Sequence, residues 1–127
     1  MAPDYSKPPY SFYAPPGTVK VSAAALQLAR EFAEEIAPTR PEPENDWVIS
    51  FDWAESRSIR RRVGGPREEL GPGLDLAAYA RSDVPPEVIQ VSDGLEFAIQ
   101  IPKQVREASK ELLIDYDATV LSKLTLR

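Results

Sequence analysis

A β-hairpin is predicted by residues 88–101, which read VIQVSDGLEFAIQI. Val88 to Val91 form an apolar run, and Ser92-Asp93-Gly94 then supplies residue types favoured in tight hairpin turns. The run from Leu95 to Ile101 follows, and Pro102 ends it. Large apolar side chains take every second position of this run, so they are expected to share one face of the strand: Leu95, Phe97, Ile99 and Ile101.

Two further strands are predicted upstream of the hairpin. Residues 47–53 alternate between an aromatic-rich face and a smaller, more polar one, and the aromatic-rich face holds Trp47, Ile49, Phe51 and Trp53. Core packing is the favoured interpretation of the two tryptophans, and a platform for stacking a ligand is the alternative. Leu74, Leu76 and Ala78 predict a second strand by the same alternation.

A long amphipathic helix is predicted over residues 23–37, after a short strand through Val19 and Val21. Ser22 stands at the N-cap position, and Pro38 stops the run. Ala25, Leu28, Ala29, Phe32, Ala33 and Ile36 recur at helical spacing, while Arg30, Glu31, Glu34 and Glu35 take the solvent side. We expect this helix to face the core and not to bind a ligand.

The C-terminal part predicts three short elements. Residues 104–112 predict a helix whose inward face carries Val105, Ala108 and Leu112. Residues 113–116 predict a strand, and weak alternation over residues 119–126 predicts a final edge strand or a loose end.

The chain contains no cysteine and no histidine. Thiolate and imidazole are the main ligands of zinc, iron–sulfur clusters and haem, so only hard cations held by oxygen remain as candidates. Asp115 and Asp117 flank Tyr116 but lack further ligands, so no metal site is predicted there. Triads that need histidine or cysteine are excluded within one chain, and we predict no catalytic residue and no cofactor.

The net charge of −5 disfavours nonspecific nucleic-acid binding, because basic side chains supply most of that affinity. No charged and apolar leader opens the chain and no run approaches the length of a membrane span. We therefore expect a cytoplasmic protein that acts on neither membranes nor nucleic acid.

A basic cluster stands out against this acidic average. It consists of Arg57, Arg60, Arg61, Arg62 and Arg67, within a turn-rich segment from Ala54 to Gly73 that allows a short strand through Ile59 and Val63. Guanidinium groups beside glycines are suited to bind an anion or an acidic protein partner. The alternative is a solvated loop neutralised by nearby acids, Glu55, Glu68 and Glu69.

Residues 1–17 form a segment rich in proline and aromatic side chains, which favours extended or polyproline conformation. We expect a disordered tail, or one that lays its aromatic side chains on the domain of residues 18–127. The alternative is a recognition motif that docks on a partner through Tyr5, Tyr10, Phe12 and Tyr13.

Three stretches resemble the HesB-like family, the A-type iron–sulfur carriers. Residues 19–25 (VKVSAAA) resemble the entry into the family's first helix, residues 93–102 (DGLEFAIQIP) resemble its hairpin glycine and following strand, and residues 113–116 (LIDY) resemble its Ile-Asp-Tyr element. The likeness covers residues 18–116. It implies a small α+β domain of mixed, mostly antiparallel strands packed with one long and one short helix.

The chain departs from the family where the cluster ligands stand. The Gly-rich stretch around Gly64, Gly65, Gly71 and Gly73 has no cysteine, Arg127 stands where a Cys-Gly-Cys tail would begin, and Ile101 replaces an aspartate. Because iron–sulfur transfer needs thiolates, the family's activity is not expected here.

Three functions are compatible with these residues. The first is a non-catalytic, cysteine-free protein-interaction module that could also form a homo-oligomer. The second is an accessory factor of iron–sulfur cluster assembly that pairs with a cysteine-bearing carrier. The third is a small-anion binder or enzyme that uses the arginine-rich loop and a pocket bordered by Trp47 or Trp53.

Overall fold

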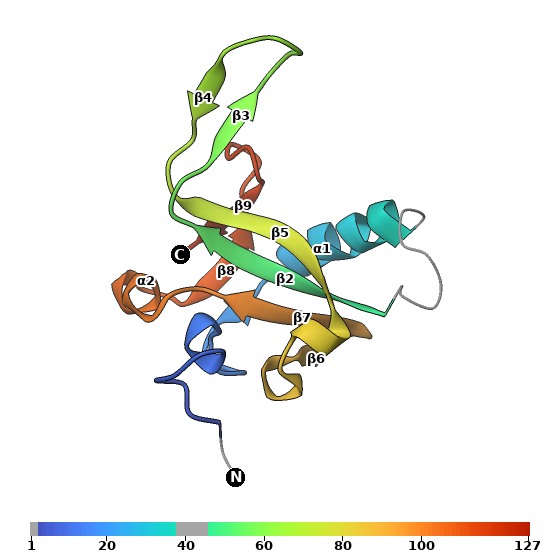
Figure 1. The fold of residues 1–127 in the computed structure, drawn as a ribbon, viewed down its shortest axis with the longest axis vertical. Helices are drawn as coiled ribbons and strands as arrows, with labels where there is room; N and C mark the ends of the chain where they lie inside the picture. The colour runs from blue at the N-terminus through green and yellow to red at the C-terminus, as the bar shows by residue number, and fades with distance from the viewer. Residues whose placement is uncertain (1–2, 38–45) are drawn as a thin grey trace.

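The computed structural model describes residues 3–37 and 46–127, which form an α+β domain (Figure 1). The helical elements are the long helix α1 (Ala23–Ile36), the short helix α2 (Lys103–Ala108) and the 3₁₀ turns η1 (Tyr10–Phe12), η3 (Arg81–Asp83) and η4 (Pro86–Val88). The strands are β1 (Lys20–Val21), β2 (Trp47–Ala54), β3 (Ser58–Arg60), β4 (Arg67–Glu69), β5 (Gly73–Ala80), β6 (Gln90–Ser92), β7 (Leu95–Gln100), β8 (Leu113–Tyr116) and β9 (Leu124–Leu126).

A four-stranded sheet in the order β5-β2-β7-β6 forms the centre of the domain. β2 pairs antiparallel with β5 and parallel with β7, and the predicted hairpin joins β6 to β7. Its two turn residues both have positive φ, 49° at Asp93 and 81° at Gly94. This is the conformation that a two-residue hairpin turn requires and that Asp and Gly tolerate best, so the hairpin prediction is confirmed.

A second sheet, β1-β8-β9, packs beside α1. β1 runs parallel to β8, and β9 pairs antiparallel with β8. α1 begins where predicted, because the Ser22 hydroxyl accepts a hydrogen bond from the Ala25 N–H at 3.2 Å. The two sheets and α1 enclose the main core around Phe51, Ile99 and Ile114.

Both faces of β2 are buried. On the α1 side Phe51 meets Phe97 edge to face, with ring centroids 5.7 Å apart. On the other side Val48 and Ala98 lie in a second apolar cluster with Tyr13, Val84 and Val88. The sequence indicated core packing for one face only, because the cover of the other face comes from distant segments of the chain.

Several boundaries differ from the sequence-based expectations. The second helix ends at Ala108, not at residue 112, because Ser109 is extended and Leu112 has a positive φ of 49°. The strand expected from Val88 begins at Gln90, because η4 takes up Pro86–Val88. The N-terminal segment contains the 3₁₀ turn η1 and is not extended throughout.

Candidate functional site

A two-stranded arm, residues 58–69, projects from the ends of β2 and β5 away from the rest of the domain (Figure 1). β3 and β4 pair only with each other, with Ser58 opposite Glu69 and Arg60 opposite Arg67. The strand expected through Ile59 and Val63 ends at Arg60, and Val63 lies in the turn at the tip of the arm. Four arginines of the basic cluster, Arg60, Arg61, Arg62 and Arg67, thus lie on a protruding hairpin.

Arg57 is set apart from the other four arginines by its position at the root of the arm. Its side chain is only 11% exposed. The guanidinium donates to the carbonyl oxygens of Gly71 at 3.1 Å and Leu74 at 3.3 Å, and to Asp75 Oδ1 and Ser122 Oγ, each at 3.3 Å. Arg57 therefore fastens the arm to the domain and is not available to a partner.

Gly73 makes room for this guanidinium. A Cβ atom at residue 73 would lie 2.4 Å from Arg57 Nη2 and 2.7 Å from Cζ, closer than real Cβ contacts. The glycine that begins β5 is thus explained by the close approach of Arg57.

The arm beyond its root is exposed and its charges are ordered along its length. Glu68 and Glu69 lie toward the root, while Arg60 and Arg67 form the outermost strand pair and Arg61 and Arg62 follow in the turn. Within the arm, Arg61 Nε donates to Glu68 at 2.8 Å and Arg67 donates to Ser58 at 2.6 Å. Arg60 and Arg62 have no ion-pair partner in the part of the chain that is described.

Val63 is the most exposed large apolar residue among those described, with a relative exposure of 105%. It stands at the tip directly after the arginines. Single exposed apolar residues are common on protein surfaces, so it is the combination of Val63 with the neighbouring arginines, and not the valine alone, that makes the tip a candidate contact surface.

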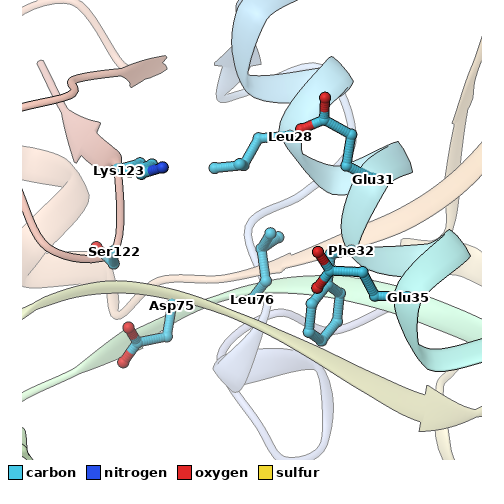
Figure 2. Close-up of a pocket in the computed structure, with 8 residues that line it drawn as sticks. All are labelled: Leu28, Glu31, Phe32, Glu35, Asp75, Leu76, Ser122 and Lys123. Atoms are coloured by element: carbon cyan, nitrogen blue, oxygen red, sulfur yellow. The ribbon is translucent and has the colours of Figure 1, made fainter.

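A groove lies beside the root of the arm, between α1, β5 and the loop before β9. It encloses about 480 Å³, and Leu28, Phe32 and Leu76 form its apolar floor. Figure 2 shows Leu28 and Leu76 pointing into the hollow, with Glu31 and Glu35 on the α1 wall and Lys123 on the opposite wall. Asp75 and Ser122, both partners of Arg57, complete the lining.

The groove is not predicted by the sequence, because the apolar stripe of α1 indicates a core-facing helix alone. Glu31 and Glu35 are one helical turn apart and border Leu28 and Phe32, so the helix has a carboxylate edge next to an exposed part of its apolar stripe. Neither glutamate has an ion-pair partner within residues 3–37 and 46–127. That edge was visible in the sequence, but the opposing wall from β5 and the loop before β9 was not.

The four aromatic side chains of the N-terminal segment differ in their accessibility. Tyr13 is buried in the second apolar cluster, and Tyr5 and Tyr10 pack against that cluster. The Tyr10 hydroxyl donates to Glu87 at 3.1 Å, which raises its pKa. Only Phe12 is exposed, at 57%, beside a hollow of about 160 Å³ next to Trp53. The segment therefore lays its three tyrosines on the domain, which is one of the two arrangements expected for a tail.

The two tryptophans border separate hollows at opposite ends of β2. Trp47 lines one of about 280 Å³ with Ile36 and Leu95, and Trp53 lines one of about 350 Å³ with Val105 and Leu126. None of the arm's arginines lines either hollow. The structure therefore does not bring the arginine cluster and a tryptophan pocket into one site.

A polar network lies on the strand face that the N-terminal segment covers. Asp52 accepts hydrogen bonds from the hydroxyls of Ser50 and Tyr79, and Gln100 donates to Ser50 Oγ at 3.4 Å. Burial, together with the bond to Asp52, raises the pKa of Tyr79 to about 12. Tyr79 is therefore a protonated donor at neutral pH, and the network satisfies polar groups within the sheet.

Asp115 and Asp117 are engaged in local contacts. Asp115 accepts from Arg127 Nε at 2.9 Å, and Asp117 accepts from the N–H and hydroxyl of Thr119 at 3.0 and 2.6 Å. Among residues 3–37 and 46–127, no group of three or more acidic side chains is placed to hold a metal ion.

Comparisons with family models, with curated proteins and with solved structures gave no match to this chain. In the described part of the chain, no helix combines the length and the apolar character needed to cross a membrane.

Proposed function

We propose that this protein is a non-catalytic interaction module that docks through the arm onto an acidic surface of a protein partner. The observation that carries the proposal is the tip of the arm, where the fully exposed Val63 follows three arginines on a hairpin that Arg57 fixes to the domain.

The arm contributes little to the packing of the fold, so the fold does not explain why the arm has this composition. Its strands pair only with each other, and no residue from Ser58 to Glu69 belongs to either apolar cluster. Burying one valine against a partner contributes roughly 1.5–3 kcal/mol, and each guanidinium can add a bidentate contact with a carboxylate. The tip thus offers both an apolar anchor and charge selectivity.

A fixed root makes the arm suited to recognition. A hairpin held at one end by several charge-assisted hydrogen bonds loses less conformational freedom on binding than a free loop does. Its exposed arginines also speed the encounter with an acidic surface at low salt.

An acidic protein surface fits this arm better than a nucleic acid does. The chain carries a net charge of −5, and two glutamates lie within the arm itself. A phosphate backbone would meet repulsion from both, whereas a local carboxylate cluster on a protein engages only the tip.

Affinity capture with three forms of the full chain tests the proposal. The arm variant carries Arg60→Ser, Arg61→Ser and Arg62→Ser, and the matched control replaces three exposed cations outside the arm, Lys7, Lys103 and Lys110, by serine. We expect the arm variant alone to lose its partners. Identical partner profiles for all three forms would refute the proposal.

Phe12→Ser is the suitable variant for testing the N-terminal segment. Deleting residues 1–17 would remove Tyr13 and Ala14 from the core, where their exposures are 6% and 0%. Loss of partners on such a deletion would then report unfolding and not recognition.

A further inference from the structure

We propose that the acidic groove beside the arm root receives the arm of a second copy of this chain, so that two copies exchange arms in a symmetric dimer. The inference rests on the proposed function, since it identifies the partner of the same arm. It also gives the groove an occupant of defined chemistry.

The position of the groove favours exchange between two copies. Asp75 and Ser122 line the groove and also bind Arg57, so the groove opens at the root of the arm. From Ser58 to Val63 the arm is six residues long, and such a stretch extends at most roughly 20 Å from its root. The tip projects away from the domain, so it cannot fold back into the groove of its own chain (Figure 1).

We place the two arms side by side and antiparallel. Each tip then reaches the root of the other arm, and therefore the groove of the other chain. A two-fold axis between the arms makes the two contacts identical, and the assembly closes without leaving an unused arm or groove.

The order of charges along the arm is complementary to itself in this antiparallel arrangement. Arg60 and Arg62 at the tip come opposite Glu69 at the other root and opposite Glu31 and Glu35 in the other groove. Arg60, Arg62, Glu31 and Glu35 each lack an ion-pair partner within the described chain. A parallel arrangement would instead place arginine against arginine.

The apolar surfaces match as well. The apolar side chain at the tip is the fully exposed Val63. The apolar side chains that line the groove are Leu28, Phe32 and Leu76. The groove, at about 480 Å³, has room for the valine with the stems of its arginine neighbours. Lys123 on the far wall offsets part of the acidic charge, and Glu31 and Glu35 on the α1 wall remain for the arginines of the incoming tip.

Charge reversal on the full chain tests the exchange. The arm variant Arg60→Glu/Arg62→Glu leaves the Arg61–Glu68 pair intact, and the groove variant is Glu31→Arg/Glu35→Arg. Sedimentation equilibrium should show a dimer for the wild type and a dimer dissociation constant raised roughly 100-fold or more for each variant alone. A mixture of the two variants should dimerise again, because each reversed arm then meets a reversed groove and each native arm meets a native groove.

Site-directed cross-linking adds a positional test, which the absence of native cysteine makes clean. A chain with Val63→Cys mixed with a chain with Glu31→Cys should give a cross-linked pair with a short bismaleimide. Val63→Cys alone should not, because the two tips lie at opposite ends of the paired arms. Lys103→Cys on α2, whose native side chain is 80% exposed, replaces Glu31→Cys in the control.

Each outcome separates this inference from the proposed function. A wild type that stays monomeric, a dimer that persists in both charge-reversed variants, or equal cross-linking to residue 103 overturns the exchange. If the arm still captures other proteins in those cases, the proposed function stands. If neither the dimer nor the captured set responds to the arm substitutions, both fail.

Discussion

Replacing Gly73 by alanine should destabilise the protein only while Arg57 is present. The new Cβ would lie 2.4 Å from Nη2 and 2.7 Å from Cζ of Arg57, so the guanidinium must shift away from residue 73. The shift would stretch or break its bonds to two carbonyl oxygens, Ser122 and Asp75.

The expected loss in the free energy of unfolding follows from the strength of these hydrogen bonds. A hydrogen bond that involves a charged group contributes roughly 1.5–3 kcal/mol, but several bonds from one guanidinium are not additive. The ion pair with Asp75 counts for little, because that carboxylate is 47% exposed. We expect Arg57→Ala to lower the free energy of unfolding by about 3 kcal/mol, and Gly73→Ala by about 2 kcal/mol.

The double variant Arg57→Ala/Gly73→Ala shows whether the cost of Gly73→Ala comes from Arg57. Without Arg57 the alanine at position 73 meets no obstacle, and alanine is roughly 0.5–1 kcal/mol better than glycine inside a strand. Gly73→Ala should therefore be neutral or slightly stabilising in the Arg57→Ala background. Urea unfolding of the four proteins gives the coupling, and Arg60→Ala, an exposed arginine of the arm, is the control that should change stability by less than about 0.5 kcal/mol. An equal loss from Gly73→Ala in both backgrounds would refute the account of the arm root.

Three further outcomes are expected. Ser22→Ala removes the N-cap of α1 and should lower the free energy of unfolding by about 1 kcal/mol in urea titrations, whereas Ser22→Thr, which keeps a hydroxyl beside the Ala25 N–H and Asp115, should restore most of it. Hydrogen bonds from Ser22 and Arg127 lower the pKa of Asp115, so its contribution to stability is present above the ordinary carboxyl pKa and is lost as pH falls through the lowered value; Asp115→Asn should flatten the pH dependence of unfolding below about pH 4. Burial and the bond to Asp52 raise the pKa of Tyr79 to about 12, so stability should fall as pH rises from about 10 toward that value, and Tyr79→Phe should remove this fall when unfolding is followed against pH.

Local chemistry explains which elements the sequence predicted correctly. The Asp93-Gly94 turn, the Ser22 cap and the alternation in β2 each depend on a few neighbouring residues, and each is present in the structure. The aromatic face of β2 does pack against the core, with Phe51 fully buried. The α+β class follows from these elements alone.

The remaining features depend on contacts between distant parts of the chain. Arg57 resembles its neighbours in sequence, and only the return of the chain at Gly71 to Asp75 surrounds it with acceptors. Tyr13 looks like a tail residue until the face of β2 that needs a cover is known. The groove likewise requires β5 and the loop at Ser122 to lie opposite α1, which no pattern along one segment can show.

The resemblance to the HesB-like family stays a prediction, and so does an accessory role in iron–sulfur assembly. Co-purification with a cysteine-bearing carrier of that family would support the role. The arm variant supplies the control, because a carrier that binds equally well to Arg60→Ser/Arg61→Ser/Arg62→Ser would bind elsewhere on the chain.

The central claim is that the arm tip and the α1–β5 groove bind each other between two copies. Hydrogen exchange followed by mass spectrometry, on the full chain above and below the concentration at which it dimerises, tests it most directly. Amides of the arm, residues 58–69, and of α1 around Glu31 should gain protection together on dimerisation, while those of α2 should not change. Protection that appears elsewhere while the arm stays as exposed as in the monomer would contradict the account.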